Sequence, residues 1–145
     1  MKHTDLYING QWREGTAKER FDVINPATEE VIASVASAEI ADANAALDAA
    51  EAAMKDWAAR TPRARSEVLR KAWELMTERL EYFANLITLE NGKARADAMG
   101  EATYAAEFFR WFAEEAVRAD GLLTHAPASG ARIMVQHKPA GLAVL

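Results

Sequence analysis

Hydrophobic and polar positions alternate in the first part of the chain as they do in short β-strands. Residues 6–13 form one such stretch, interrupted by Asn9-Gly10, a dipeptide that favours a two-residue hairpin because both turn positions need positive φ. Residues 21–24 alternate again and stop at Asn25-Pro26, since proline lacks the N–H group that a strand ladder needs. Residues 31–35 are apolar and rich in β-branched side chains. The pattern predicts a small, mostly antiparallel sheet.

The middle of the chain has the period of three long helices. Apolar residues recur at three- and four-residue steps between Ile40 and Trp57, along one face of a first helix. A second helix is predicted from Thr61-Pro62 to Gly92, because Thr caps a helix, Pro suits its first turn and Gly ends it. A break near Leu80 is compatible with this spacing.

The third predicted helix, from about residue 94 to about residue 119, carries two apolar stripes. One stripe consists mainly of alanine with a few larger residues, and the other is aromatic: Tyr104, Phe108 and Trp111. A helix that is apolar on two faces is usually covered on both. So few other elements are available in this chain that we expect it to be part of a longer protein.

The last part of the chain reads as extended structure. Residues 126–130 are typical of a loop, and residues 132–137 of a strand that ends at Lys138-Pro139. Residues 141–145 begin with a glycine and continue with apolar residues only, as in a strand buried on both faces of a parallel sheet. The predicted fold class is therefore α/β: a small antiparallel sheet, three long helices, then extended strands.

Composition narrows the class of protein. A length of 145 residues suits one domain, and a net charge of −5 argues against a nucleic-acid partner. No apolar run reaches the roughly 18–20 residues that span a bilayer, so we expect no membrane partner. The start of the chain lacks a secretory signal, which makes a cytoplasmic location the expectation. The sequence has no cysteine, which excludes disulfides and thiolate metal sites.

The residues by themselves name no reaction. Three histidines are far apart in the sequence, so a histidine metal site is not expected. The glutamates near the aromatic stripe are typical of a solvated helix face, although a general acid–base pair could be built from such residues. No strand is followed by a glycine-rich phosphate loop. We assign no catalytic residue.

Five short motifs, in order, nevertheless resemble the aldehyde dehydrogenase family over residues 6–145. They are residues 8–12, residues 25–32, the spaced set Trp57, Arg65 and Leu69, the run 90–93 with Ala98 and Glu101, and residues 139–141. The run 104–115 resembles the succinate-semialdehyde dehydrogenase branch. Two positions depart from the pattern: Glu29 stands where the family often has a turn glycine, and Asp120 where the branch often has an aromatic residue.

The resemblance implies the N-terminal part of an NAD(P)-binding domain. Residues 1–121 would belong to the coenzyme-binding domain, 122–138 to an arm of strands, and 139–145 to the start of a truncated Rossmann-type strand. The parent enzyme would oxidise a small aldehyde such as succinate semialdehyde with NAD or NADP, through a cysteine thioester. Its asparagine, glutamate and cysteine would follow Leu145. Alternatives are another small-aldehyde enzyme of the betaine-aldehyde type, or a non-catalytic helical interaction module.

Three roles follow from the resemblance for residues in this chain. A structural Na⁺ or K⁺ would lie between backbone oxygens at Val23 or Ile24 and the Glu90 side chain; the alternative for Glu90 is a surface charge at a helix end. Tyr104 and Phe108 would line the mouth of the substrate tunnel; their alternative is core packing. The arm would join subunits of a homo-oligomer, a dimer or a tetramer.

Overall fold

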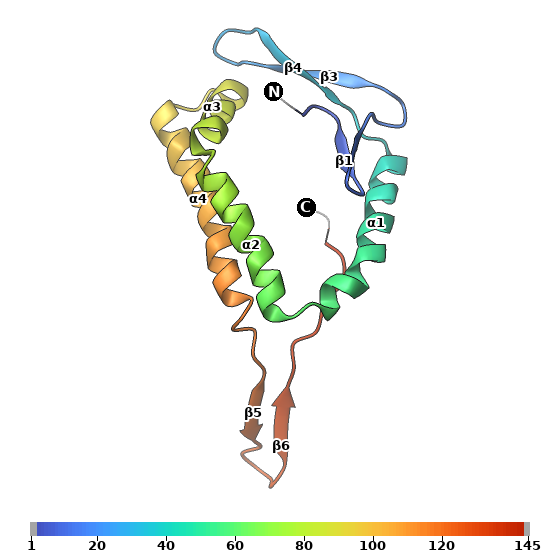
Figure 1. Cartoon of the computed structure of the whole chain (residues 1–145), viewed down its shortest axis with the longest axis vertical. Coiled ribbons are helices and arrows are strands. Elements are labelled where there is room, and N and C mark those ends of the chain that lie inside the picture. Colours follow the sequence, from blue (N-terminus) through green and yellow to red (C-terminus); the bar gives the residue numbers. More distant parts are fainter. Residues whose placement is uncertain (1–2, 144–145) are drawn as a thin grey trace.

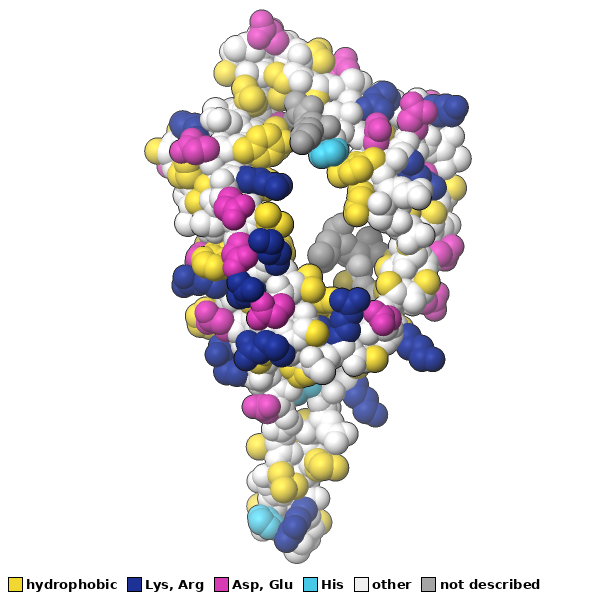
Figure 2. Space-filling view, viewed as in Figure 1, with side chains coloured by type: hydrophobic (Ala, Val, Ile, Leu, Met, Phe, Trp, Pro, Cys, Tyr) yellow, Lys and Arg dark blue, Asp and Glu magenta, His cyan; other side chains and the backbone are white. Residues whose placement is uncertain are grey.

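The computed structural model describes residues 3–143, which form an open ring with a two-stranded arm (Figure 1). The side chains leave the centre of the ring open as well (Figure 2). The six strands among these residues are β1 (Leu6–Ile8), β2 (Gln11–Arg13), β3 (Arg20–Ile24), β4 (Val31–Ala36), β5 (Leu122–His125) and β6 (Arg132–Val135). The four helices are α1 (Ile40–Ala59), α2 (Pro62–Thr77), α3 (Leu80–Asn91) and α4 (Arg95–Glu115). No helix in this range is long and apolar enough to cross a membrane.

The first four strands form two hairpins. β1 pairs with β2 through a turn in which Asn9 has φ 50° and Gly10 has φ 78°, as the dipeptide predicts. β3 pairs with β4, and Ile32 is the extra residue of a bulge opposite Val23 and Ile24. The predicted single sheet is wrong, because each hairpin is its own two-stranded sheet. A hydrogen bond of 2.8 Å from the Ala36 N–H to the Thr4 carbonyl connects the end of β4 with the start of the chain.

The second predicted helix is two helices, so the prediction of three helices is corrected to four. Arg79 leaves the helical region, with φ −118° and ψ 19°. The Arg79 N–H bonds to the Met76 carbonyl at 3.0 Å, which tightens the last turn of α2 before α3 starts at Leu80. Neither proline nor glycine marks this break, and the apolar spacing continues across it. The Thr61 cap is confirmed, since its hydroxyl accepts from the Ala64 N–H at 3.2 Å.

The core lies between α4 and its two neighbouring helices. α4 buries one stripe of small side chains against α2 and α3: Ala98, Ala102, Ala106 and Ala113. Ala84 of α3 is also buried, and larger residues pack around it and the first two of these alanines: Leu80, Phe83, Ile87 and Met99. Alanine at helical spacing lets helices approach closely, which explains why small residues make up the core. α4 ends at Glu115, a turn earlier than predicted.

The ring is completed by a contact between the turn after β3 and the end of α3, at a place distant from the α1–α2 connection. Gly92 follows α3 with φ 74°, the left-handed cap that the sequence predicts. A Cβ at Gly92 would lie 2.9 Å from the Pro26 Cγ, so the turn after β3 packs directly on the end of α3. The residue therefore meets two demands at once: a backbone conformation that favours glycine and a neighbour that leaves no room for a side chain.

The arm consists of β5 and β6, which pair in antiparallel register and project away from the ring (Figure 1). All residues of both strands are exposed. β6 ends at Val135, two residues before the predicted end. Residues 141–143 form no strand, contrary to prediction, because no other described strand lies beside them to complete a ladder. Residues 144 and 145 of that predicted strand lie outside the described residues.

Candidate functional site

The side of α4 away from its alanines carries an open aromatic surface, which we call the aromatic face: Tyr104, Phe108, Trp111 and Phe112. Tyr104 and Trp111 are 66% and 62% exposed, and Phe108 is 47% exposed. Residues four apart on a helix lie one above the other, and the rings of Tyr104 and Phe108 accordingly meet edge to face at 4.9 Å. These side chains and Glu107 line an open cleft of about 410 Å³.

Glu107 is the charged group of this cleft, and its partner is nearby. The Arg110 Nε lies 3.0 Å from a Glu107 carboxylate oxygen. The Arg110 guanidinium in turn sits over the Trp73 ring of α2, at 5.8 Å from the centroid. Arg110 therefore links the edge of the aromatic face to α2 by a cation–π contact. The cleft offers apolar walls and a paired carboxylate, which suits binding of an apolar surface rather than proton transfer or nucleophilic attack.

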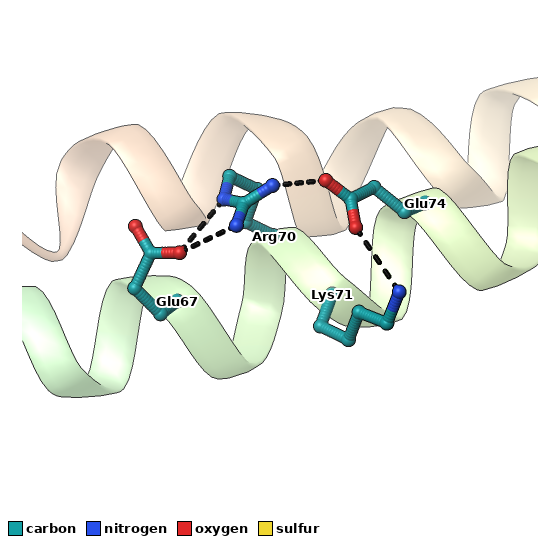
Figure 3. A network of polar contacts seen from close by, with 4 residues as sticks. All are labelled: Glu67, Arg70, Lys71 and Glu74. Atoms are coloured by element: carbon teal, nitrogen blue, oxygen red, sulfur yellow. Dashed lines mark hydrogen bonds and ion pairs between the residues drawn. The ribbon is translucent and has the colours of Figure 1, made fainter.

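A second groove, of about 360 Å³, lies between α2 and α4 and is rich in arginine. Three of its four arginines form ion pairs: Arg110 pairs with Glu107 and Arg118 with Glu115, and the third is on α2. On α2, Arg70 bridges Glu67 and Glu74, and Lys71 contacts Glu74 as well (Figure 3). The hydrogen bond from Arg70 lowers the pKa of the Glu67 carboxyl. These exposed pairs at helical spacing stabilise α2 modestly.

The residues predicted for a cation site come from two elements that the ring closure brings together. Val23 is half-buried near the end of β3, whereas Ile24 and Glu90 are exposed. Ile24 precedes Pro26 by two residues and Glu90 precedes Gly92 by two, so the Pro26–Gly92 contact places both segments in one region. Glu90 forms no ion pair or hydrogen bond within residues 3–143. This same range holds no cluster of three or more acidic, histidine or cysteine side chains suited to a metal.

The most buried polar site was not predicted. Asp42, only 1% exposed, accepts four hydrogen bonds: from Arg13 Nη2 at 2.6 Å, the Thr16 N–H at 2.9 Å, the Thr16 hydroxyl at 2.8 Å and the Glu39 N–H at 3.0 Å. The backbone N–H groups of Thr16 and Glu39, with Thr16 having the larger effect, hold the pKa of the Asp42 carboxyl well below its usual range, although burial alone would raise this pKa. Asp42 thereby fixes the β1–β2 hairpin to the start of α1. The one sequence signal was an acidic residue in the first turn of a helix.

Comparison with known proteins decides the family. A sequence profile of the aldehyde dehydrogenase family matches residues 12–145. The chain belongs to the aldehyde dehydrogenase family. It is 51% identical over 115 residues to a succinate-semialdehyde dehydrogenase of Paenarthrobacter nicotinovorans, which covers 79% of this chain and 26% of the relative.

Solved aldehyde dehydrogenase structures have the same fold. An NADP-dependent enzyme of Escherichia coli superposes with a TM-score of 0.85 at 38% identity, covering 91% of this chain and 27% of the other. A betaine aldehyde dehydrogenase of Staphylococcus aureus in complex with NAD⁺ gives a TM-score of 0.81 at 30% identity, covering 86% and 26%. The family resemblance and the α/β fold class are thus confirmed. The chain spans about a quarter of the length of the relatives it matches.

The departure at Glu29 has a clear structural outcome in this aldehyde dehydrogenase chain. Glu29 adopts φ 61°, the conformation that a turn glycine would take without strain. Its N–H donates to the Asn25 carbonyl at 2.8 Å, and the Asn25 N–H donates to the Glu30 carbonyl at 2.9 Å. The turn between β3 and β4 therefore keeps its shape with a non-glycine residue held in a left-handed conformation.

Proposed function

We propose that this chain is the N-terminal part of an NAD(P)-dependent aldehyde dehydrogenase that oxidises succinate semialdehyde to succinate through a cysteine thioester. The observation that carries the proposal is the 51% identity to a succinate-semialdehyde dehydrogenase. The thiol belongs to the rest of that protein, since this sequence has no cysteine, and in this proposal the general base lies there too. Residues 3–143 likewise include no glycine-rich phosphate loop between a strand and a helix.

The division of the chain follows the elements described above. In our proposal residues 1–121 belong to the coenzyme-binding domain and 122–138 to the oligomerisation arm, and residues 139–145 become the start of a Rossmann-type strand when strands from the rest of the protein lie beside them. The exposed cross-strand pair Leu123 and Met134 supports an arm that pairs with another subunit in a homodimer or homotetramer. A cytoplasmic location stays a prediction.

A direct assay tests the activity. The protein that carries this chain is purified, and reduction of NAD and of NADP is followed with succinate semialdehyde and with betaine aldehyde. We expect succinate semialdehyde to have the higher kcat/KM. A preference for betaine aldehyde, whose dehydrogenase shares the fold, would favour the alternative enzyme. The 145-residue chain by itself should reduce neither coenzyme, because no thiolate is available to attack the carbonyl.

The third alternative, a non-catalytic helical module, makes a different prediction. A coding sequence that stops after Leu145, together with binding of the 145-residue product to a full-length subunit, would support the module. A reading frame that continues with an asparagine, a glutamate and a cysteine of the family would support the enzyme.

The aromatic face is proposed to line the mouth of the substrate tunnel, with Tyr104 and Phe108 in contact with the aldehyde's path. Their exposure supports this role over packing in the core of this chain. Phe108→Ala should change the ratio of kcat/KM between a short and a longer aldehyde by about tenfold, since pocket contacts of this size carry that discrimination. Phe21→Ala, at an exposed phenylalanine on β3, is the matched control and should leave the ratio unchanged.

A further inference from the structure

The chain contains two Asn-Gly dipeptides that the fold treats in opposite ways: Asn9-Gly10 and Asn91-Gly92. Both asparagine side chains are exposed, and neither forms a hydrogen bond with another described residue. We propose that Asn9 is a site of spontaneous deamidation and isoaspartate formation, whereas Asn91 is protected by the structure around Gly92.

The chemistry requires only water and the residues themselves. The backbone nitrogen of the glycine attacks the Cγ of the preceding asparagine, its proton is lost, and the side-chain nitrogen leaves as ammonia. A five-membered succinimide results. Water then adds to one of the two succinimide carbonyls and opens the ring to aspartate or isoaspartate. The glycine nitrogen must be free of a hydrogen bond and able to swing toward the side chain, and glycine favours this because it has no Cβ to obstruct the approach.

The Asn9-Gly10 turn meets these conditions. The two residues form the connection of the β1–β2 hairpin, with Ile8 and Gln11 directly opposite each other on either side of it. The Gly10 N–H has no acceptor within residues 3–143. Gly10 is exposed and a Cβ placed on it would meet nothing within 4 Å, so water can reach a succinimide formed in this turn.

The Asn91-Gly92 dipeptide does not meet them. The Gly92 N–H donates to the Thr88 carbonyl at 2.9 Å, which completes the last turn of α3 and occupies the nitrogen that would attack. Pro26 packs against Gly92 and limits movement of its backbone. Reaction at Asn91 therefore requires both the helix end and the ring closure to open first.

Deamidation at Asn9 would reach beyond the turn. Isoaspartate puts an additional methylene into the main chain, where the hairpin register depends on a two-residue connection. β2 ends at Arg13, whose guanidinium contacts the buried Asp42 at 2.6 Å. A changed register in β2 displaces this arginine, so the modified protein should lose part of the link between the hairpin and α1.

Peptide mapping of the protein that carries this chain tests the proposal. The protein is incubated in mildly alkaline buffer, and deamidation and isoaspartate are quantified at both asparagines over time by mass spectrometry and isoaspartyl methyltransferase labelling. In the native protein we expect Asn9 to react at least about tenfold faster than Asn91, because one backbone hydrogen bond must be broken at the second site. In denaturant, or in the isolated peptides, both should react at comparable rates.

Two variants complete the experiment. Asn9→Gly removes the reacting amide while keeping a residue that accepts the φ of 50°, and it should abolish the isoaspartate signal at position 9 of the native protein. Thr88→Pro is unsuitable as the second variant because proline would break α3. Pro26→Ala is used instead; it loosens the contact on Gly92 and should speed reaction at Asn91. Equal native rates at the two sites, faster reaction at Asn91, or no native reaction at Asn9 while its peptide reacts would each overturn the proposal.

Discussion

The ring closure at Gly92 gives a stability prediction with an internal control. In Gly92→Ala the backbone of the alanine would have to keep a φ of 74°. Its methyl group would lie 2.9 Å from the Pro26 Cγ. Gly100 offers the opposite case, because it lies inside α4 and a Cβ there would meet nothing within 4 Å. The same chemical change is therefore expected to destabilise at one position and to stabilise at the other.

The magnitudes follow from these two environments. A left-handed alanine costs about 1–2 kcal/mol, and forcing a methyl into a filled space costs about 1–3 kcal/mol more. Alanine also restricts the unfolded chain, which offsets about 0.4–1 kcal/mol of that cost. We expect Gly92→Ala to lower the free energy of unfolding by about 1–5 kcal/mol. Gly100→Ala should raise it by about 0.5–1 kcal/mol, the difference between the two residues in a helix interior.

Urea unfolding of the 145-residue chain, followed by far-UV circular dichroism at two protein concentrations, measures both changes. Agreement between the two concentrations shows that association does not contribute. A second variant, Pro26→Ala in the Gly92→Ala background, should recover the part of the loss that comes from crowding and leave the part that comes from φ. If Gly92→Ala is as stable as the wild type, or if both glycine variants lose stability equally, the reasoning about this contact is wrong.

Three further predictions concern single residues. Glu29→Gly should raise the free energy of unfolding by about 0.5–1 kcal/mol in urea titrations, because it relieves a left-handed glutamate at the entropic cost of glycine. Asp42→Asn should lower the melting temperature by several degrees at neutral pH. Because the folded-state pKa of Asp42 is lowered, the stability advantage of the wild type should be present above about pH 4 and disappear as the pH falls further. Parallel curves of melting temperature against pH for the two proteins would refute this. If Glu90 binds a structural cation, Glu90→Gln should lower the free energy of unfolding by on the order of 1–3 kcal/mol. The variant should also gain less melting temperature than the wild type when sodium or potassium replaces a bulky cation at fixed ionic strength. Equal gains in the two proteins would leave Glu90 a surface charge.

Local signals in the sequence predict the local structure well. Asn9-Gly10 predicts a turn with two positive φ angles, Thr61 predicts a helix cap, and Gly92 predicts a left-handed helix end, and all three are confirmed. Each depends on the conformational preference of one or two residues, which the sequence states directly. The pairing of Tyr104 with Phe108 is equally local, since the two are one helical turn apart.

Features that depend on distant residues were missed. The Asp42 site joins residues 26 and 29 positions apart, and no periodicity reports such a contact. The break at Arg79 has no proline or glycine to mark it, and it arises where α3 turns to pack on α4. The strand predicted at 141–145 depends on a partner strand that no local pattern supplies, and its described residues, 141–143, form none. The two segments of the candidate cation site were brought together in the prediction only by the family resemblance, and the Pro26–Gly92 contact places them in one region.

The open ring has a consequence for how this part of the protein is made. Every residue in the second half of α1, residues 51–59, is exposed, whereas α4 buries a full stripe of alanines. As the chain leaves the ribosome, α1 is the first helix to emerge, and only its start is held, by the contacts of Asp42 with the β1–β2 hairpin; the order of its second half depends largely on the helix preference of its many alanines. A helix of this length is marginal in water without tertiary contacts. Amide hydrogens in residues 51–59 should therefore exchange early in a nascent chain of this length, long before those of α4.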